Sequence, residues 1–404
     1  MTTREKKDKP NRLIIIACVV VAFLALAILI FLPNLRRRWS APLGPALELP
    51  TYTLSLPAES STQMSNVQPL PQTGTAVSQE ETQALLTTTS IAFSAGASPL
   101  PPTPTIAPTS APLCGAPPVM VVLGVGVDTE DNNYTYGLGD AIRIARLDFV
   151  TPRVTVLSLP RDLWVEIPGI SDHYGITRGK LNQSYLYGSP GMGYYDSPGA
   201  GPGLMARTLD LNFGLRVDHY GAVNMLTFSR IVDEVGGIEI YLPEDVDGRP
   251  TNETTEDMGY FDSGQQHFTG DEALRFSRIR KRYNDFTRMD HQSMVLCALK
   301  EKLLAPTVLP RIPKIIGAFQ DSVITDLSLE QLSQMACLLP YLSKENLIFT
   351  GLPEEIMQPG RATNPQTGIT TFIMDVDFQV IREYVSQFLA GTWPVEGGEE
   401  TTCD

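Results

Sequence analysis

Hydrophobic residues are concentrated near the amino terminus, in an uninterrupted apolar run from Leu13 to Pro33. A run of this length spans the roughly 30 Å hydrocarbon core of a bilayer as a helix. Five basic residues lie in the stretch 1–12 and three in Arg36–Arg38, and this bias favours a cytoplasmic amino terminus. We therefore predict a cytoplasmic tail at 1–12, a transmembrane helix at 13–33 and an extracytoplasmic main domain.

A cleaved signal peptide is the competing interpretation of the same run. Its apolar part is longer than a usual signal core, and the arginines at 36–38 make a poor approach to a cleavage site. We therefore favour a retained anchor that crosses the cell membrane once.

Residues 34–113 lack the apolar periodicity of the rest of the chain and are rich in Pro, Ser, Thr and Ala. Such a composition does not build a core, and Pro-rich chain is semi-extended. We predict an extracytoplasmic low-complexity linker that holds the following domain away from the bilayer.

From residue 114 to 390, short strand-like runs alternate with helix-like patterns, which is typical of an α/β domain. Strands are expected at 119–125, 141–147, 154–159, 163–167 and 237–242, the second and third of them forming a hairpin. Helices are expected at 201–214, 224–237, 270–280 and 289–304, with two more helices and two more strands behind them. Residues 391–404 are expected to form a loose acidic tail.

The charge composition of the chain bears on the kind of ligand it binds. The formal net charge is −14 and the pI is about 4.8, whereas general nucleic-acid binding needs many clustered cations. We therefore expect no nucleic-acid partner. The basic cluster Arg278–Arg282 stands out against this acidic background and points to a bound anion.

Arg278 and Arg280 would project to the same side of an extended segment, and paired guanidinium groups suit bidentate phosphate recognition. A solvated basic surface is the competing interpretation of this cluster. The chain contains no GxxxxGK[ST] loop for a nucleotide.

Two carboxylates form a candidate metal site. Asp128 follows the first expected strand and Asp140 opens the second, so both are expected at one edge of the sheet. Magnesium binds through a few carboxylates together with substrate phosphate oxygens. The competing interpretation is ordinary turn chemistry, because Asp beside Gly and Asn is common in turns.

Arg161 follows the third expected strand, where strand ends of α/β sheets commonly face a ligand crevice. It is a candidate phosphate ligand. A surface ion pair with Asp162 explains the same residue without any function.

Four cysteines lie beyond the expected membrane span, namely Cys114, Cys297, Cys337 and Cys403. An even number on the exported side permits disulfides. We expect the pairs Cys297–Cys337 and Cys114–Cys403, with free thiols as the alternative. No spacing among these residues suggests zinc.

Five segments together resemble the LytR-CpsA-Psr family of cell-envelope proteins. In chain order they are GVDTEDNNYTYGLGD, SLPRDLWVEIPG, KLNQSYLYG, DHYGAVNMLTFSRIVDEVGGIEIYLP and FTGDEALRFSRIRKRYNDFTRMDHQ. The resemblance covers most of residues 119–305. It implies a mixed central sheet flanked by helices, an αβα domain with an apolar lipid tunnel that the helices at 201–235 help to build.

The resemblance also implies a function: transfer of a glycopolymer from a polyprenyl diphosphate carrier to a cell-wall glycan hydroxyl, forming a phosphodiester. It places Mg²⁺, or another divalent cation, on Asp128 and Asp140. It assigns diphosphate binding to Arg161, Arg278 and Arg280, and further site roles to Arg288 and Gln292. Asp285 would be an acid, a base or a positioning carboxylate.

This chain departs from the family pattern at two positions. Leu138 stands where the pattern has an arginine, and His291 stands where the pattern has an arginine before Gln292. A histidine beside an anion carries charge near neutral pH, so His291 is expected to substitute in part. Three consequences stay open: reduced activity, a different donor, or compensation by a cation such as Arg143, Lys180 or Arg282.

Three functions fit these residues. The first is the magnesium-dependent phosphotransferase at the cell membrane. The second, motivated by Leu138, is a lipid-binding or regulatory module without turnover. The third is a polyprenyl diphosphate hydrolase that uses water as acceptor. A purely structural surface protein leaves the ordered carboxylates and arginines unexplained.

Overall fold

The computed structural model describes residues 37–50, 111–130, 134–253, 256–280, 285–319, 322–394 and 401–402. The expected tail 1–12, the expected span 13–33 and residues 51–110 lie outside these ranges. Within these ranges, no helix combines the length and the hydrophobicity that crossing a bilayer requires.

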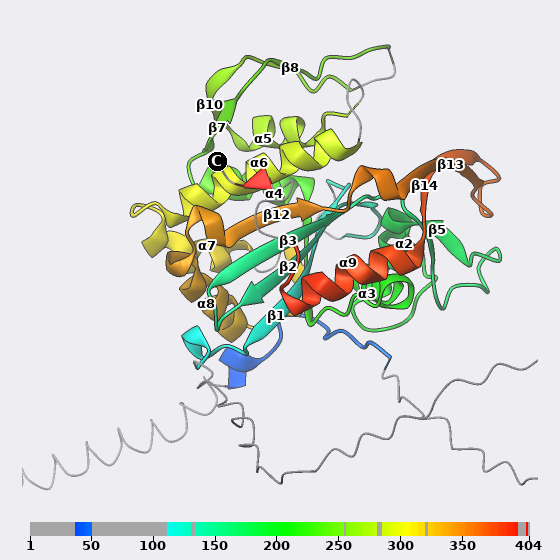
Figure 1. The fold of residues 1–404 in the computed structure, drawn as a ribbon, viewed down its shortest axis with the longest axis horizontal. Coiled ribbons are helices and arrows are strands. Elements are labelled where there is room, and N and C mark those ends of the chain that lie inside the picture. The colour runs from blue at the N-terminus through cyan, green and yellow to red at the C-terminus, as the bar shows by residue number, and fades with distance from the viewer. Residues whose placement is uncertain are drawn as a thin grey trace, which may run out of the picture. The chain divides into compact units, whose positions relative to one another are not determined.

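A mixed sheet forms the centre of the domain (Figure 1), with the strand order β11-β6-β1-β2-β3-β12-β15. β1, β2 and β3 are antiparallel neighbours, whereas β6 runs parallel to β1 and β12 runs parallel to β3. The bounds are β1 (Val119–Val127), β2 (Gly139–Asp148), β3 (Arg153–Leu159), β6 (His219–Asn224), β11 (Val323–Thr325), β12 (Leu347–Gly351) and β15 (Thr401–Thr402).

Four two-stranded ribbons surround this sheet. They are β4 (Trp164–Glu166) with β5 (Arg178–Lys180), β7 (Ile238–Leu242) with β10 (Gly264–Phe268), β8 (Val246–Asp247) with β9 (Tyr260–Phe261), and β13 (Met357–Thr363) with β14 (Thr370–Val376).

Helices cover both faces of the sheet, as Figure 1 shows. One face carries α2 (Leu181–Gly188), α3 (Ala200–Phe213) and α9 (Phe378–Ala390), which bury the main core with β1, β2 and β3. The other face carries α4 (Met225–Glu234), α5 (Gly270–Arg278), α6 (Asp285–Leu304) and α8 (Leu329–Leu338), with α7 (Ile312–Phe319) beside α4. The predicted class, a mixed sheet flanked by helices, is confirmed.

Local sequence explains where the helices near the site begin and end. α3 ends because Gly214 adopts the left-handed conformation, with φ of 66°. α5 begins at a capping box in which Thr269 and Glu272 satisfy each other's backbone amides. α5 ends at Arg278 because Ile279 is extended, with ψ of 124°. The helix expected at 270–280 is therefore confirmed as far as Arg278, and the alternative in which Arg278 and Arg280 share an extended segment is wrong.

The expected role of the helices at 201–235 is correct only in part. α4 lies over the cavity described below, but α3 packs on the opposite face of the sheet. The reason is that Leu204, Leu209 and Phe213 are buried in the main core together with Leu123 of β1, which is not part of the cavity wall.

Residues 37–50 belong to the domain, contrary to the expected linker at 34–113. Leu43 N donates to Leu327 O over 3.1 Å, and Tyr220 Oη donates to Pro45 O over 2.9 Å. Leu47 and Leu49 pack against the main core. The segment after the expected membrane span is thus attached to the domain before the Pro-rich stretch begins.

The disulfide pairing also differs from the prediction. Cys114, in the short helix η1 (Leu113–Gly115), is bonded to Cys337 at the end of α8. Both expected pairs are wrong, because each needed one of these two cysteines. Cys403 lies outside the described residues.

The expected loose tail at 391–404 is ordered in two places. Trp393 packs edge-on against Tyr384 with ring centroids 5.2 Å apart. Thr401 and Thr402 form β15, which pairs with β12 at the edge of the sheet. The domain therefore extends beyond residue 390.

Candidate functional site

A large cavity lies between the sheet and helices α4, α5, α6 and α8, with a volume of about 820 Å³. Much of its floor is made of residues with small side chains or none, listed here in chain order: Gly124, Gly126, Ala141, Ala145 and Gly221. A Cβ atom added at Gly221 would meet nothing within 4 Å. The cavity exists because these residues leave the space beneath the helices unfilled.

Most of the cavity wall is apolar. The helices contribute Phe228, Ile231, Val295, Leu296, Leu299, Leu303, Met335 and Leu339, and the sheet contributes Leu147, Val154, Val156, Leu347 and Phe349. The size falls within the range of small-molecule sites, about 300–1,000 Å³. Such a wall suits a long hydrocarbon ligand.

Charged side chains gather where β1 ends and β2 begins. Asp128 follows β1 and Asp140 is the second residue of β2, and both line the cavity. Arg278, Arg280, Arg288 and Gln292, from α5, its C-terminal extension and α6, line it too. The structure therefore brings together six of the site residues expected from the sequence.

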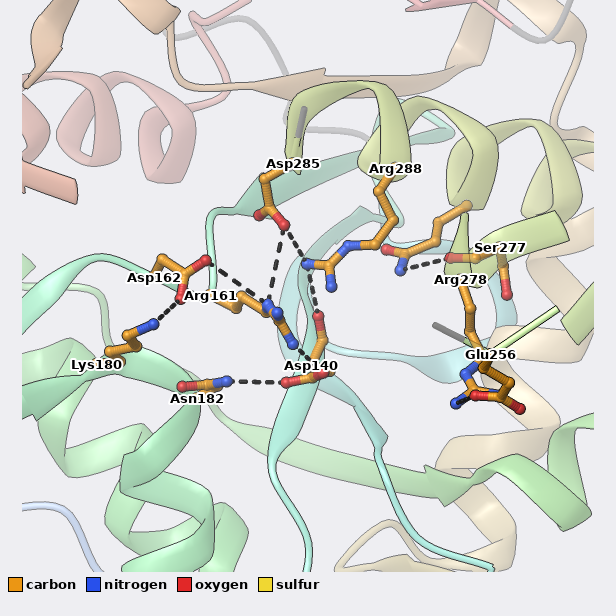
Figure 2. A network of polar contacts seen from close by, with 11 residues as sticks. Asp140, Arg161, Asp162, Lys180, Asn182, Glu256, Ser277, Arg278, Asp285 and Arg288 are labelled. Carbon is orange, nitrogen blue, oxygen red and sulfur yellow. Dashed lines mark hydrogen bonds and ion pairs between the residues drawn. The ribbon is translucent and has the colours of Figure 1, made fainter. Parts of the chain in front are cut away.

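Asp140 is the centre of a polar network (Figure 2). Its carboxylate forms an ion pair with Arg161, and its Oδ1 accepts from Asn182 Nδ2 over 2.8 Å. Its backbone oxygen accepts from Arg288 Nη2 over 3.3 Å. Arg161 is buried behind Asp140 and is absent from the cavity wall. It therefore contacts the carboxylate of Asp140, which does line the cavity.

The surface ion pair expected between Arg161 and Asp162 is instead buried, and Asp162 also contacts Lys180. Asp162 Oδ2 is 3.8 Å from Arg161 Nε, and its Oδ1 is 2.7 Å from Lys180 Nζ. Both aspartate and arginine are buried. Lys180 is thus engaged by Asp162 and is a poor replacement for the arginine missing at 138.

Asp285, the first residue of α6, has a largely buried side chain that lies between two arginines. Its Oδ1 is 2.8 Å from Arg288 Nη2 and 3.8 Å from Arg161 Nε. Burial raises the pKa of Asp285, while the two arginines oppose that rise. Asp285 is outside the cavity wall, and its contact with Arg288 fits the expected role of a positioning carboxylate.

Arg278 is paired with a carboxylate that the sequence did not single out. Its Nη1 and Nη2 donate to Glu256 Oε1 and Oε2 over 3.2 and 2.9 Å. Both residues line the cavity, and the pair is partly exposed. Exposed pairs contribute about 0–1 kcal/mol, so a phosphate group can displace Glu256 at little cost.

His291 does not take the place of the pattern's arginine. Its side chain packs against Phe276, with ring centroids 4.4 Å apart, and is absent from the cavity wall. Burial lowers the pKa of His291 to about 4. The expected partial substitution is therefore wrong, because the ring is neutral at pH 7 and points into the core.

The carboxylate pair fits a divalent cation. Burial raises the pKa of Asp128, and the neighbouring Asp140 raises it further, so the two negative charges repel each other. No group of three or more metal-ligating side chains occurs in the described part of the chain. The protein would thus supply two carboxylates, leaving the other positions to phosphate oxygens and water, as magnesium prefers.

The residues that sequence reasoning missed are contact partners of the expected ones. Asn182 reaches Asp140 across 42 positions of the chain, and Glu256 reaches Arg278 across 22. Ser277 O accepts from Gln292 Nε2 over 3.3 Å. No spacing rule links residues so far apart, although Asn182 does lie in one of the five segments that carry the resemblance.

Comparison with known proteins identifies relatives of this chain. The model of the LytR_cpsA_psr family matches residues 116–377. The polyisoprenyl-teichoic acid–peptidoglycan teichoic acid transferase TagU of Enterococcus faecalis is 28% identical over 219 residues, covering 53% of this chain and 64% of the relative. The corresponding transferase TagV of Bacillus subtilis is 27% identical over 212 residues, covering 52% and 50%.

A relative named regulatory protein MsrR, from Staphylococcus aureus, is 26% identical over 190 residues, covering 46% of this chain and 51% of the relative. The chain thus spans about half to two thirds of the length of these curated relatives.

Two solved structures share the fold. The crystal structure of B. subtilis TagV superposes with a TM-score of 0.51 at 21% identity, covering 67% of this chain and 97% of that one. The protein gbs0355 of Streptococcus agalactiae gives 0.53 at 20% identity, covering 67% and 88%. With the family match extending over more than half of its length, the chain belongs to the LytR-CpsA-Psr family.

Proposed function

We propose that this protein is a phosphotransferase of the cell membrane that moves a glycopolymer from a polyprenyl diphosphate carrier to a hydroxyl of the cell-wall glycan. The observation that carries the proposal is an apolar cavity of about 820 Å³ whose charged end holds Asp128, Asp140, Arg280 and Arg288. A ligand with a long hydrocarbon tail and a doubly phosphorylated head matches both halves of this cavity.

The reaction needs little chemistry from the protein beyond positioning and charge neutralisation. The acceptor oxygen forms a bond to the phosphorus that carries the glycan and loses its proton. The bond from that phosphorus to the bridging oxygen breaks, and polyprenyl phosphate leaves. The products are a phosphodiester and the carrier monophosphate, so no nucleotide is consumed.

The arginines of the cavity wall supply the charge that this step requires. Arg278 and Arg280 stand at the end of α5, and Arg288 is held against the site by Asp285. Guanidinium groups bind phosphate oxygens bidentately. These residues would stabilise the negative charge that grows on the leaving polyprenyl phosphate.

Asp128 and Asp140 are the residues that would hold a divalent cation. Neutralising the two phosphates is the chemistry that bound Mg²⁺ supplies in phosphoryl transfer. Arg161 and Asn182 hold the Asp140 carboxylate in its place at the cavity wall.

The proposed location is the outer side of the cell membrane. It rests on the apolar run 13–33 and on the excess of basic residues before it. A carrier lipid embedded in the same bilayer would then reach the cavity without leaving the membrane surface.

The experiment is transfer of a labelled glycan from a polyprenyl diphosphate donor to cell-wall fragments by the full-length protein with Mg²⁺. We expect Asp140→Asn to lower the rate by about 100-fold or more, the effect of removing one preorganised charge from such a site. Asp148→Asn is the matched control, because Asp148 lies on the same strand but outside the cavity wall.

The other two functions appear as distinct outcomes. Release of polyprenyl phosphate without labelled cell wall would identify a hydrolase. Donor binding without any release would identify a lipid-binding module. Either outcome contradicts the proposed transferase.

A further inference from the structure

Arg143 is a buried guanidinium on the floor of the cavity. On β2, alternate residues face the cavity, and the set is Ala141, Arg143, Ala145 and Leu147. Arg143 is 8% exposed, among small and apolar neighbours. Burying a charge is unfavourable unless it is paired, so a charged residue at this position requires an explanation.

The protein satisfies only part of this side chain. Arg143 Nη2 donates to Met289 O over 2.8 Å and to Gln292 Oε1 over 2.9 Å, both on α6. Nη1 is buried and has no hydrogen-bond partner within the described part of the chain. A buried donor without a partner is rare and destabilising, which leaves room for an acceptor from a ligand.

The positive charge of Arg288 also acts on Arg143. Arg288 is close enough to lower the pKa of Arg143, although burial lowers it more and it stays near 10. Arg288 also lines the cavity, and its Nε is a second buried donor without a partner among the described residues. Two like charges, each with an unused donor, form a site for an anion.

We propose that Arg143 and Arg288 together bind phosphate oxygens of the donor, with Gln292 fixing the direction of Arg143. The identification of the anion as the diphosphate of the carrier lipid rests on the proposed function. The anion site itself rests on the buried hydrogen-bond donors Nη1 of Arg143 and Nε of Arg288. Arg143 then supplies a positive charge at the cavity of a chain that has Leu138 where the family pattern has an arginine.

The experiment uses the full-length protein in detergent micelles and two probes. Inorganic pyrophosphate, titrated without acceptor, reports the anion site alone, and the polyprenyl diphosphate donor reports KM and kcat. The variants are Arg143→Gln, which loses the charge, and Arg143→Lys, which keeps it. Arg146→Gln is the control, because Arg146 is buried on the same strand and faces the opposite side, where it donates to Leu389 O over 3.0 Å.

We expect Arg143→Gln to weaken pyrophosphate binding by roughly tenfold or more, the loss of a charge-assisted hydrogen bond. The KM for the donor should rise by a similar factor, while Arg143→Lys recovers part of both and Arg146→Gln changes neither. Equal pyrophosphate binding by wild type and Arg143→Gln would overturn the inference.

A wild-type measurement decides the matter if Arg143→Gln does not fold. The guanidinium ¹⁵N resonance of Arg143, assigned by its absence from Arg143→Lys, should shift when pyrophosphate is added. An unchanged resonance at saturating pyrophosphate overturns the inference. If pyrophosphate binds as expected but wild type transfers no glycan, the proposed function fails while the anion site stands.

Discussion

At the scale of single residues, the candidate site separates into groups that face the cavity and groups that support them. Asp128, Asp140 and Arg280 face the ligand space, whereas Arg161 holds Asp140 from behind and Asp285 contacts Arg161 in turn. Sequence motifs identify both kinds without distinguishing them. The difference depends on burial, which the chain acquires only when β2, α2 and α6 meet.

His291 shows this difference in a measurable way. Its pKa is about 4, below the ordinary value of 6.5, because burial disfavours the charged ring. As pH falls from 6.5 towards 4, the unfolded chain takes up this proton first, so the stability contributed by a neutral His291 is present above pH 6.5 and is lost below it.

We expect the free energy of unfolding of wild type to fall by about 2 kcal/mol more than that of His291→Leu between pH 7.5 and pH 5. Denaturant unfolding at the two pH values measures this difference. Parallel losses in the two proteins would show that His291 is not buried as a neutral ring.

At the scale of secondary structure, the glycine in β6 decides how much space the ligand has. Gly221 faces the cavity, whereas its neighbours Tyr220 and Ala222 face the main core. An added Cβ at Gly221 meets nothing within 4 Å. A larger side chain there fills the cavity without displacing the protein.

Gly221→Leu should therefore fold normally and discriminate between donors by tail length. We expect the KM for a long-chain polyprenyl donor to rise about tenfold, because the new side chain occupies space that the tail needs, while a short-chain donor is affected less. Kinetics with the two donors measure the effect.

Gly351→Leu is the control for this experiment, since an added Cβ on Gly351 also meets nothing within 4 Å but the residue lies outside the cavity wall. Equal losses for both donors in Gly221→Leu would argue that the tail does not lie beside β6.

The sequence predicted the strands with strong apolar patterns and missed those without. β1, β2 and β3 were expected from runs such as VMVVLGV, whereas β6, HYGAVN, was not, because glycine and asparagine interrupt its pattern. α2 was missed because its buried face includes Asn182 and Ser184. Polar residues on a buried face hide the periodicity on which such a prediction depends.

The disulfide could not be predicted from the same patterns. Four cysteines allow several pairings, and their spacing does not choose among them. Cys114 and Cys337 meet because η1 lies against α8, a contact between segments 223 residues apart.

At the scale of the whole molecule, the attachment of residues 37–50 changes the expected architecture. These residues pack on the domain, and a short β-bridge joins Pro42 to Ser328. In the sequence, the Pro-rich stretch 51–109 therefore comes between two segments of one compact unit.

Substitutions in this segment test that conclusion. Leu47 packs against the main core, whereas Leu43 is 38% exposed. We expect Leu47→Ala to lower the free energy of unfolding by about 1–2 kcal/mol, less than for a fully buried leucine. Leu43→Ala should change it by less than about 0.5 kcal/mol. Equal and small effects in denaturant unfolding would contradict the packing of residues 37–50 on the domain and would agree with the expected linker at 34–113.

The most direct test of the whole account is a crystal structure of the protein with a polyprenyl diphosphate and Mg²⁺. We predict the hydrocarbon tail in the cavity beside Gly221 and Leu296, with the diphosphate and the metal between Asp128, Asp140 and Arg280. A lipid bound elsewhere on the domain, with this cavity empty, would contradict the proposed function.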